Sequence, residues 1–348
     1  MCKDRLLFYK LTHHKICWLT GKTNLIGQLV NRRIGKFPIK RWTEKMLRTF
    51  NEVLNKAKEY GPKKMAVASA GAEDVLKAVE AARREGLTNS ILVGDKKEII
   101  QIANKIGIDP ANYEIIDETD KTETAKCAVK LVRNKNASIL MKGMMGTARL
   151  LKAILDKEIG LRTNRLLSHA YILEVKNYNR LIVITDGAMN INPDLNQKAQ
   201  IIQNAIYFCH ALGIEKPKVA VLAAVELVNP AMSATIDAPC LAKMSERGQI
   251  VGGIVDGPLA FDNAISKKSA LHKGIKSSVS GEVDVLLAPD IEAANIFAKG
   301  LVYLAKAKPA GILLGAKAPV ALVSRSDSAE SKLFSIALGV LMSEKDNF

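Results

Sequence analysis

The chain of 348 residues has few of the features that mark secreted and membrane proteins. Its five cysteines, at positions 2, 17, 127, 209 and 240, are widely spaced and form no C-x-x-C pair. This pattern excludes a disulfide framework and a zinc knuckle, and it indicates reduced thiols in a cytoplasmic protein. Apolar runs such as VAVLAAV at 219–225 are far shorter than the roughly 18 residues that a membrane helix requires, so we expect no membrane association.

Motifs of nucleotide-dependent and metal-dependent chemistry are also missing. No G-x-G-x-x-G follows an apolar run, and TGKT at 20–23 lacks the upstream glycine of a P-loop. No group of His, Cys, Asp or Glu has metal-ligand spacing, and there is no G-x-S-x-G nucleophile motif. His169 and His272 are isolated, and we interpret each as an ordinary polar residue. We therefore expect neither a bound metal nor a permanently bound cofactor.

Positive charge is abundant but uneven along the chain. Lys and Arg outnumber Asp and Glu by 51 to 35, a net charge of +16. Residues 1–45 contribute +9 of this, which leaves +7 for residues 46–348. Nucleic-acid binding needs basic residues with interleaved aromatics, and residues 46–348 contain only 12 aromatics. We therefore expect no nucleic-acid partner.

Residues 1–45 also differ in composition from the rest of the chain. They hold both tryptophans and no serine, and lysines and histidines interrupt every apolar segment that a secretion signal would need. From Met46 the sequence MLRTFNEVLNKAKEYG has regular helical periodicity. We interpret residues 1–45 as a basic extension that is non-native or mis-started, with Met46 as the natural start; a functional arm is the alternative.

From residue 46 onward, short apolar segments alternate with helical periods. The segments KMAVASA (64–70), SILVG (90–94), SILMKG (138–143) and KVAVLAAV (218–225) are typical of buried strands. Strands separated by helices of 10 to 15 residues indicate right-handed βαβ crossovers. The sequence therefore predicts an α/β protein with a largely parallel sheet, organised as two lobes of one continuous architecture.

Polar residues follow several of these segments, where parallel sheets commonly bind ligands. They are Lys142 and Gly143 before a helix that Thr147 is expected to cap, Asp186 and Asn190 in ITDGAMNINP, Asp256 and Asn263 in IVDGPLAFDNA, and Ser324 and Arg325 in VSRSDSAES. An Asp-Gly pair after a strand is also a common structural turn, and this is the interpretation that we favour for Asp256.

Arg325 is the most informative of these residues. It precedes a helix in which Asp327 and Glu330 have capping-box spacing, so its cation lies near the positive end of a helix dipole. That position is unfavourable by up to about 1 kcal/mol. A bound phosphate would offset this cost through the helix amides and the bidentate guanidinium. Lys142 has a similarly unfavourable position. The alternative for both residues is a solvated surface cation or a pair with a nearby carboxylate.

Taken in order, these segments resemble the phosphate acetyl/butyryltransferase family, and its phosphate butyryltransferase branch in particular. The likeness extends from about residue 46 to the end and lies in the series LMKG, RLLSH, ITDGAMNINPDLNQKAQII, KVAVLAAVE, IVDGPLAFDNAIS, HKG, LLAPDIEAANI and SRSDSAESKL.

The resemblance implies an acyltransferase that moves a short acyl group, butyryl first, between coenzyme A and inorganic phosphate. Butyryl-CoA and phosphate would give butyryl phosphate and CoA by direct attack, without a covalent enzyme intermediate. It also implies a homo-oligomer, with coenzyme A as substrate. The implied fold is similar to the isocitrate and isopropylmalate dehydrogenases, with one lobe of residues 46–150 and 290–348, a second of 151–289, and the active site in the cleft between them.

The resemblance also implies roles for individual residues. Arg325 would hold phosphate, Ser324 would donate a hydrogen bond, and Asp327 is a candidate base for the CoA thiol. The acetyl branch has an acid seven positions after the serine, where this chain has Ser331, so Glu330 stays open as the alternative base. The remaining substrate-binding candidates are Lys142, Gly143, Asp186, Asn190, Asp256, Lys273 and Ser331.

Two other enzyme activities stay open at this point. The first is a phosphate acetyltransferase with acetyl-CoA as substrate. The second is a metal- and NAD-dependent dehydrogenase on the same fold. That activity needs a cluster of aspartates, and the chain offers only the scattered Asp186, Asp256 and Asp262.

Overall fold

The computed structural model describes residues 45–344, so the predicted extension at 1–45 lies outside the described residues apart from Lys45. The helices are α2 (Phe50–Lys58), α3 (Glu73–Arg84), α4 (Lys96–Lys105), α5 (Lys121–Arg133), α6 (Thr147–Ile154), α7 (Leu195–Ala211), α8 (Ser233–Glu246), α9 (Phe261–Ile265), α10 (Lys267–His272), α11 (Ile291–Tyr303) and α12 (Ala329–Ser343), with a short 3-10 turn at Pro110–Asn112. Among these residues, no helix has the length and hydropathy to cross a membrane.

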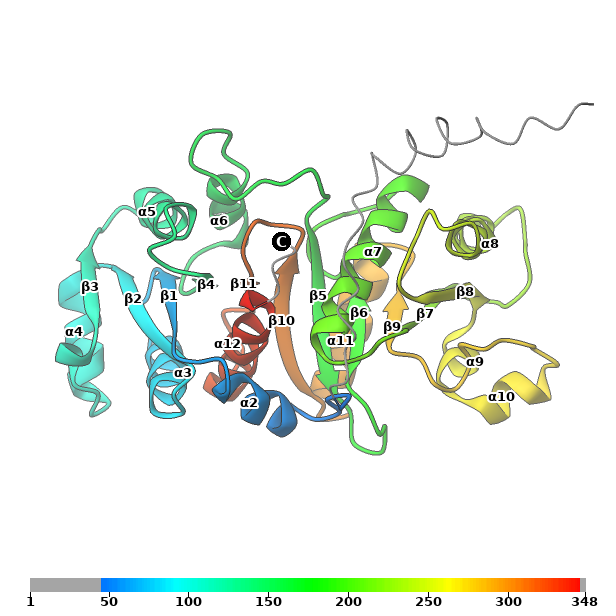
Figure 1. The fold of residues 1–348 in the computed structure, drawn as a ribbon, viewed down its shortest axis with the longest axis horizontal. Coiled ribbons are helices and arrows are strands. Elements are labelled where there is room, and N and C mark those ends of the chain that lie inside the picture. The colour runs from blue at the N-terminus through cyan, green and yellow to red at the C-terminus, as the bar shows by residue number, and fades with distance from the viewer. Residues whose placement is uncertain (1–44, 345–348) are drawn as a thin grey trace, which may run out of the picture. The chain divides into compact units, whose positions relative to one another are not determined.

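Within residues 45–344 the strands form one sheet of eleven, in the order β3-β2-β1-β4-β11-β10-β5-β6-β9-β7-β8 (Figure 1). Most neighbours are parallel, but β5 is antiparallel to both β6 and β10, and β10 is antiparallel to β11. The strands are β1 (Lys63–Ala68), β2 (Thr88–Gly94), β3 (Glu114–Asp117), β4 (Ile139–Lys142), β5 (Ser168–Glu174), β6 (Ile182–Thr185), β7 (Lys218–Leu222), β8 (Ile254–Leu259), β9 (Val285–Leu287), β10 (Lys308–Leu314) and β11 (Val320–Ala321).

This sheet corrects the expected fold. The sequence predicted a two-lobed fold like the isocitrate and isopropylmalate dehydrogenases, with largely parallel sheets and a cleft between the lobes. The structure has the α/β alternation but places all its strands in a single mixed sheet. The reversals arise at the connections β5–β6 and β10–β11, which are too short for the crossover that parallel strands need. The division into one lobe of residues 46–150 with 290–348 and a second lobe of residues 151–289 stays a prediction.

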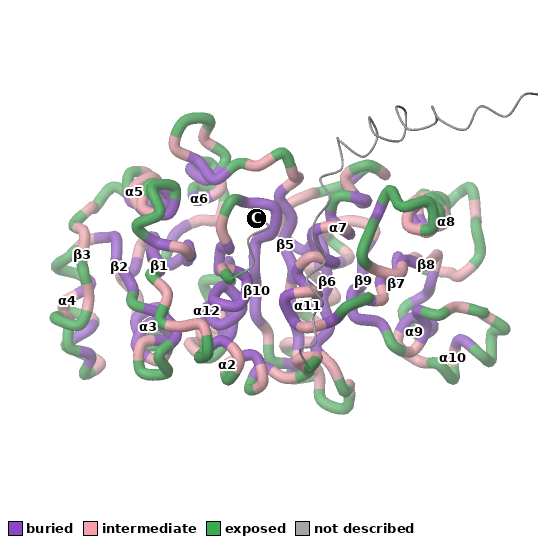
Figure 2. Tube along the Cα trace, in the orientation of Figure 1, coloured by how far each residue is buried: buried purple, intermediate pink, exposed green. Residues whose placement is uncertain are grey.

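The two faces of the sheet are covered differently. One face packs on a continuous hydrophobic cluster to which α2, α3, α4, α7, α8 and α12 contribute. Within it the rings of Phe50 and Phe334 stack at 4.3 Å. The other face carries two separate clusters, one under α5 and α6 and one under α9 and α11. Figure 2 shows the central strands as buried over most of their length.

Polar residues occupy the boundary between the two clusters of the second face. His169 of β5 pairs with Leu313, which belongs to the first cluster, and lies two residues from Tyr171, which packs on the second. Because alternate residues of a strand share a face, His169 and Tyr171 both lie on this divided face. In the middle of the sheet, this face therefore carries polar side chains, whereas on either side of them it carries buried apolar side chains.

Candidate active site

Lys142 ends β4 and is buried, with 2% of its surface exposed. Its Nζ donates one long hydrogen bond, 3.5 Å, to the carbonyl of Met145. The chain turns sharply after it, because a Cβ at Gly143 would lie 2.1 Å from the carbonyl oxygen of Ser69. The expected cap of the next helix is wrong: Gly146 occupies the N-cap and Thr147 is the first helical residue, with no side-chain capping bond.

The loop from β11 to α12 holds the Ser-Arg pair. The Asp327 carboxylate accepts a hydrogen bond from the backbone N–H of Ser324, 2.8 Å, and the Ser324 hydroxyl lies 3.0 Å from that of Ser326. Arg325 is exposed at the tip of this loop. Asp327 is therefore a carboxylate that shapes the Ser324–Arg325 turn.

The predicted capping box at α12 is wrong. Ser328 is the N-cap, and its hydroxyl accepts the backbone N–H of Ser331 at 3.2 Å. Ser331 is buried, with its hydroxyl 3.0 Å from that of Ser328. Glu330 forms an ion pair with Lys308, with 3.0 Å between Oε1 and Nζ. Asp327 and Glu330 are thus free of the capping role that their spacing suggested.

Lys332, in the first turn of α12, is a site residue that the sequence did not reveal. It is as buried as Lys142, at 2% exposed, and its Nζ donates to the backbone carbonyl of Asp327. Burial lowers its pKa, against the opposing attraction of the Asp327 and Asp74 carboxylates. Its position in an apolar helical stretch, KLFSIALG, gave no signal of a polar site.

The electrostatics bring Lys142, Arg325, Lys332 and Asp327 together. Burial, together with the Arg325 and Lys332 cations and against the opposing charge of Asp327, lowers the pKa of Lys142 to about 8. The Arg325 and Lys332 cations and the Asp327 carboxylate therefore all act on Lys142, which stands at the carboxyl end of β4 beside the parallel strand β11. Such an excess of positive charge, with two of the three basic groups buried, favours binding of an anion.

His169, on β5, contacts the segment that leads into the same loop. It is 2% exposed, and its Nε2 lies 3.2 Å from the carbonyl oxygen of Leu322, two residues before Ser324. A carbonyl accepts hydrogen bonds, so Nε2 carries the proton. Nδ1 is buried without a partner among the described residues. Burial lowers the pKa of His169, against the opposing charges of Asp186 and Asp327, which favours the neutral imidazole.

Asp186 and Asn190 form one loop after β6. The Asp186 carboxylate accepts the backbone N–H groups of Ala188 and Met189, both at 3.0 Å, and the side-chain amide of Asn190 at 2.5 Å. The same amide donates to the carbonyl of Leu167, 2.9 Å. Most of the acceptor capacity of Asp186 is therefore used to shape this loop.

Two predicted site residues lie in a different group of contacts. Lys273 pairs with Glu226 at 3.3 Å and with Asp262 at 3.4 Å. Asp256 lies inside β8 and its carboxylate accepts the N–H of Gly257, 2.8 Å, so the turn after a strand that we favoured is wrong. Neither residue shares a hydrogen bond or ion pair with the cations of β4 and α12 within residues 45–344.

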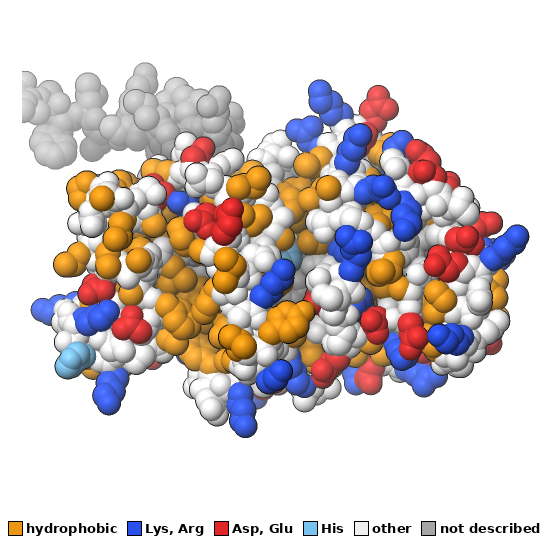
Figure 3. All heavy atoms as spheres, turned by 180° about the vertical axis from the view of Figure 1, so that it is seen from behind, with side chains coloured by type: hydrophobic (Ala, Val, Ile, Leu, Met, Phe, Trp, Pro, Cys, Tyr) orange, Lys and Arg blue, Asp and Glu red, His pale blue; other side chains and the backbone are white. Residues whose placement is uncertain are grey.

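An apolar pocket of about 240 Å³ opens beside Phe261, which is next to Asp262 in sequence. Its walls come from the carboxyl ends of β7 and β9, from α9 and from α11, and Figure 3 shows it as a hollow of hydrophobic side chains left of centre. The rings of Phe261 and Phe297 meet edge to face at 4.6 Å. The lining residues are Leu222, Ala223, Ala224, Phe261, Ala288, Pro289, Ala293 and Phe297.

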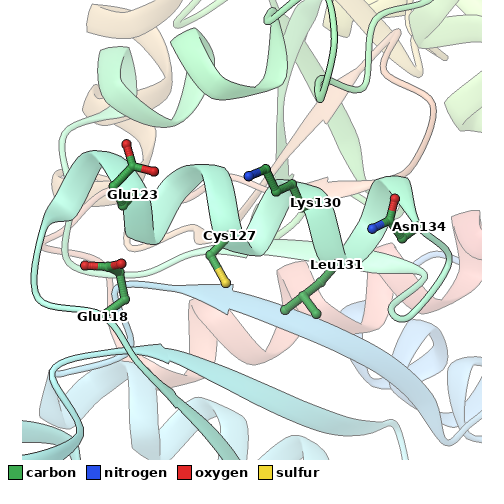
Figure 4. Close-up of a pocket in the computed structure, with 6 residues that line it drawn as sticks. All are labelled: Glu118, Glu123, Cys127, Lys130, Leu131 and Asn134. Carbon is green, nitrogen blue, oxygen red and sulfur yellow. The ribbon is translucent and has the colours of Figure 1, made fainter.

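A second pocket, of about 280 Å³, lies along α5. Figure 4 shows its lining, with Cys127, Lys130 and Leu131 on the helix and Glu118 on the preceding loop. Burial and the Glu118 carboxylate raise the pKa of the Cys127 thiol, so it is a poor nucleophile. Across residues 45–344, no three His, Cys, Asp or Glu side chains converge as a metal site requires.

Comparison with known proteins decides the family. The family model described as phosphate acetyl/butaryl transferase matches residues 49–131 and 121–340. This chain belongs to that family. It is 47% identical over 301 residues to the phosphate butyryltransferase of Clostridium beijerinckii, covering 86% of this chain and 100% of that protein. The phosphate acetyltransferase of Thermotoga maritima is 44% identical over 279 residues, 80% of this chain and 95% of that one.

Solved structures give the fold neighbours of this family member. A branched-chain phosphotransacylase from Enterococcus faecalis matches with a TM-score of 0.73 and 31% identity, over 81% of this chain and 99% of that one. Several 4-hydroxythreonine-4-phosphate dehydrogenases match at 12–14% identity with TM-scores of 0.50–0.53, a likeness of fold alone. The fold is therefore that of the phosphotransacylases, which replaces the expected likeness to isocitrate and isopropylmalate dehydrogenases.

Proposed function

We propose that this phosphate acetyl/butyryltransferase family member transfers a short acyl group, butyryl first, between coenzyme A and inorganic phosphate. The observation that carries the proposal is that the Arg325 and Lys332 cations both act on the buried Lys142, with Asp327 as the opposing carboxylate. Both substrates and the acyl phosphate product are anions. Two of the three basic groups are buried, so their attraction for a phosphate is screened less than that of surface cations.

In this proposal Arg325 and Lys332 hold the phosphate group. Arg325 offers a bidentate guanidinium on an exposed loop, where it can close over the ligand. The hydroxyl of Ser324 supplies a further hydrogen bond, and Asp327 keeps the Ser324–Arg325 turn in place through its bond to the Ser324 N–H. Gly143 lets the backbone approach closely at the end of β4, beside Lys142.

The opposite side of the site would receive the acyl-CoA. The loop shaped by Asp186 and Asn190 is fixed to α11, because Asn295 donates to the carbonyl of Gly187 at 2.9 Å. On its other side α11 lines the apolar pocket with Ala293 and Phe297. We assign this pocket to an apolar part of acyl-CoA, and Lys273 and Asp256 to its polar part, since Lys273 pairs with Asp262, the residue after Phe261 of the pocket.

The chemistry asked of these residues is direct attack within one ternary complex. In one direction the CoA sulfur attacks the carbonyl carbon of the acyl phosphate and phosphate leaves; in the other, phosphate attacks the thioester. Positioning two bound reactants removes much of the entropic barrier, and fixed donors stabilise the oxyanion of the tetrahedral intermediate. Coenzyme A enters and leaves as a substrate in each turnover.

Butyryl is favoured over acetyl by the comparison with the two relatives. The relative named phosphate butyryltransferase is 47% identical and is covered over its full length, against 44% and 95% for the relative named phosphate acetyltransferase. Acetyl-CoA is the second candidate substrate. A panel of acetyl-, butyryl- and branched acyl-CoAs, assayed for phosphate-dependent thiol release, ranks them by kcat/KM.

The site assignment is tested by Arg325→Ala. We expect loss of most activity, about 100-fold or more, with a raised KM for phosphate, because a charged bidentate contact to the substrate is removed. Arg48→Ala, which removes an exposed arginine at the start of α2, is the matched control and should keep full activity. Unchanged saturation by phosphate in Arg325→Ala contradicts the assigned role.

We also propose a cytoplasmic homo-oligomer. Several large apolar side chains are exposed, among them the neighbours Leu227 at 73% and Val228 at 56%, and an interface between copies of this chain would cover them. Light scattering after size exclusion measures the assembly, and a monomer at micromolar concentration contradicts it.

A further inference from the structure

Lys142 is unusual among the buried charged residues of this chain. An ammonium group has three hydrogens to donate, yet Lys142 makes one hydrogen bond, at 3.5 Å, and no ion pair within the described residues. Lys332, which is equally buried, donates to the Asp327 carbonyl. A buried cation with so few partners is strongly disfavoured against its neutral form.

The two cations near Lys142 lower its pKa, as burial does. The cations of Arg325, in the loop after β11, and of Lys332, in the first turn of α12, act on it electrostatically, with the carboxylate of Asp327 as the opposing charge. Burial and these neighbours bring the pKa of Lys142 to about 8, so near neutral pH it exchanges between amine and ammonium.

The proposed reaction has a proton to move. In acyl transfer to coenzyme A, the S–H proton must leave the thiol before or during attack, and a proton must reach the phosphate oxygen that departs. In the reverse direction a phosphate hydroxyl loses its proton and the departing thiolate gains one. A single group that accepts and then returns a proton, placed beside the phosphate, serves both directions.

We propose that the neutral amine of Lys142 carries this proton between the CoA sulfur and the phosphate oxygen. This inference rests on the proposed function and adds a catalytic role to a residue so far assigned only to binding.

The steps balance as follows. The Lys142 amine takes the S–H proton, and the sulfur lone pair forms the C–S bond at the acyl phosphate carbonyl. The tetrahedral intermediate collapses and breaks the C–O bond to phosphate. The Lys142 ammonium then gives its proton to the departing oxygen, which yields hydrogen phosphate and restores the amine. While protonated, Lys142 also places a positive charge beside the phosphate at the moment when the negative charge of the phosphate increases.

Asp327 was the candidate base from the sequence, and its contacts favour a positioning role. One of its oxygens accepts the Ser324 N–H, and its backbone carbonyl accepts from Lys332. A change at Asp327 would therefore disturb the loop that holds Arg325 as well as any proton transfer. Lys142 can be altered with less disturbance, since its one hydrogen bond is long.

The test separates charge from proton transfer with two variants. Lys142→Arg keeps a cation but has no accessible neutral form, so we expect kcat to fall about 100-fold or more while the KM for phosphate changes little. Lys142→Met removes both, so KM should rise as well. Lys152→Arg, an exposed lysine on α6, is the matched control and should retain wild-type kinetics. A Lys142→Arg enzyme with wild-type kcat overturns the proposal.

A pH profile of the wild-type enzyme gives a second readout that needs no variant to fold. It is measured from butyryl-CoA and phosphate, a direction in which no substrate thiol ionises. Because the amine is the active form, kcat/KM should rise as pH increases through about 8 and then level off. A flat profile between about pH 7.5 and 9.5 overturns the proposal and assigns the proton to a carboxylate such as Asp327.

Failure of the underlying function looks different. If the wild-type protein releases no thiol from any acyl-CoA in the presence of phosphate, the proposed function itself is wrong. If the wild type is active and only the Lys142 predictions fail, the function stands and Lys142 is a binding residue alone.

Discussion

Gly311 supports the candidate site from the middle of the sheet, and replacing it tests the packing there. It lies on β10 opposite Tyr171 of β5, and the imidazole of His169 passes close to it to reach the Leu322 carbonyl. A Cβ at this position would be 2.3 Å from the Leu322 oxygen and 3.1 Å from His169 Nε2. Gly311→Ala therefore forces the carbonyl that precedes the Ser324–Arg325 loop to move.

The size of the effect follows from these distances. Moving the Leu322 oxygen from 2.3 Å to the 3.0 Å that real Cβ atoms tolerate takes about 0.7 Å. Overpacking of this kind costs about 1–3 kcal/mol, and weakening the His169 hydrogen bond adds about 1 kcal/mol. We expect the free energy of unfolding to fall by about 2–4 kcal/mol, which lowers Tm by roughly 4–8 °C.

The same displacement should reduce activity. A shift of about 1 Å in a positioned group costs up to 100-fold in rate, so we expect kcat/KM for phosphate to fall about 10- to 100-fold. Tm is read by circular dichroism and activity by phosphate-dependent thiol release.

Gly300→Ala is the matched control, because a Cβ there meets nothing within 4 Å and α11 gains about 1 kcal/mol of helix propensity. A Gly311→Ala protein with wild-type Tm and phosphate kinetics would refute the reasoning.

Two further predictions concern other parts of the molecule. Hydrogen bonds from Arg83, with smaller contributions from Tyr113 and Arg84, lower the pKa of Glu80 to about 2, so its contribution to stability is present near neutral pH and is lost as pH falls from about 4.5 to 2. Glu80→Gln should lower the free energy of unfolding by about 1–3 kcal/mol at pH 7 and weaken the loss of stability over that acid range, as measured by denaturant titration at several pH values. An unchanged loss of stability in acid contradicts this prediction. Ala293→Leu, which narrows the apolar pocket, should raise the KM for butyryl-CoA about tenfold and leave the KM for phosphate unchanged. Ile296→Ala, on the exposed side of α11, is the control and should change neither KM. If both variants have the same kinetics, the pocket is not part of the acyl-CoA site.

Strands buried on both faces could be located from the sequence within a few residues, and strand direction could not. Segments such as SILVG and SILMKG are apolar throughout because both sides of β2 and β4 are covered. β5 escaped detection because His169 and Tyr171, which face the boundary between the two clusters, interrupt its apolar pattern. Without β5 the chain reversal between β5 and β6 was invisible, and the fold was assigned as largely parallel.

Within the candidate site, the sequence indicated the residues that stand at strand ends and missed those inside helices. Lys142 and Arg325 were found because they follow apolar runs and face an unfavourable helix dipole. Lys332 was missed, since a lysine in a helical period normally lies on the solvated face, and only the loop folded back over α12 buries it. Asp256 was misplaced because a Gly-Pro pair usually ends a strand, whereas β8 continues through it to Leu259.

The order of strands has a consequence for how this chain reaches its folded state during synthesis. β4 neighbours β11, and Lys142 faces Lys332, although 190 positions of chain separate the two lysines. A ribosome therefore releases β4 long before the strand that pairs with its free edge and the helix that covers it exist. That edge must be shielded meanwhile, by a chaperone or by delayed compaction. We expect nascent chains that stop before β10 to aggregate rather than accumulate as a folded first half.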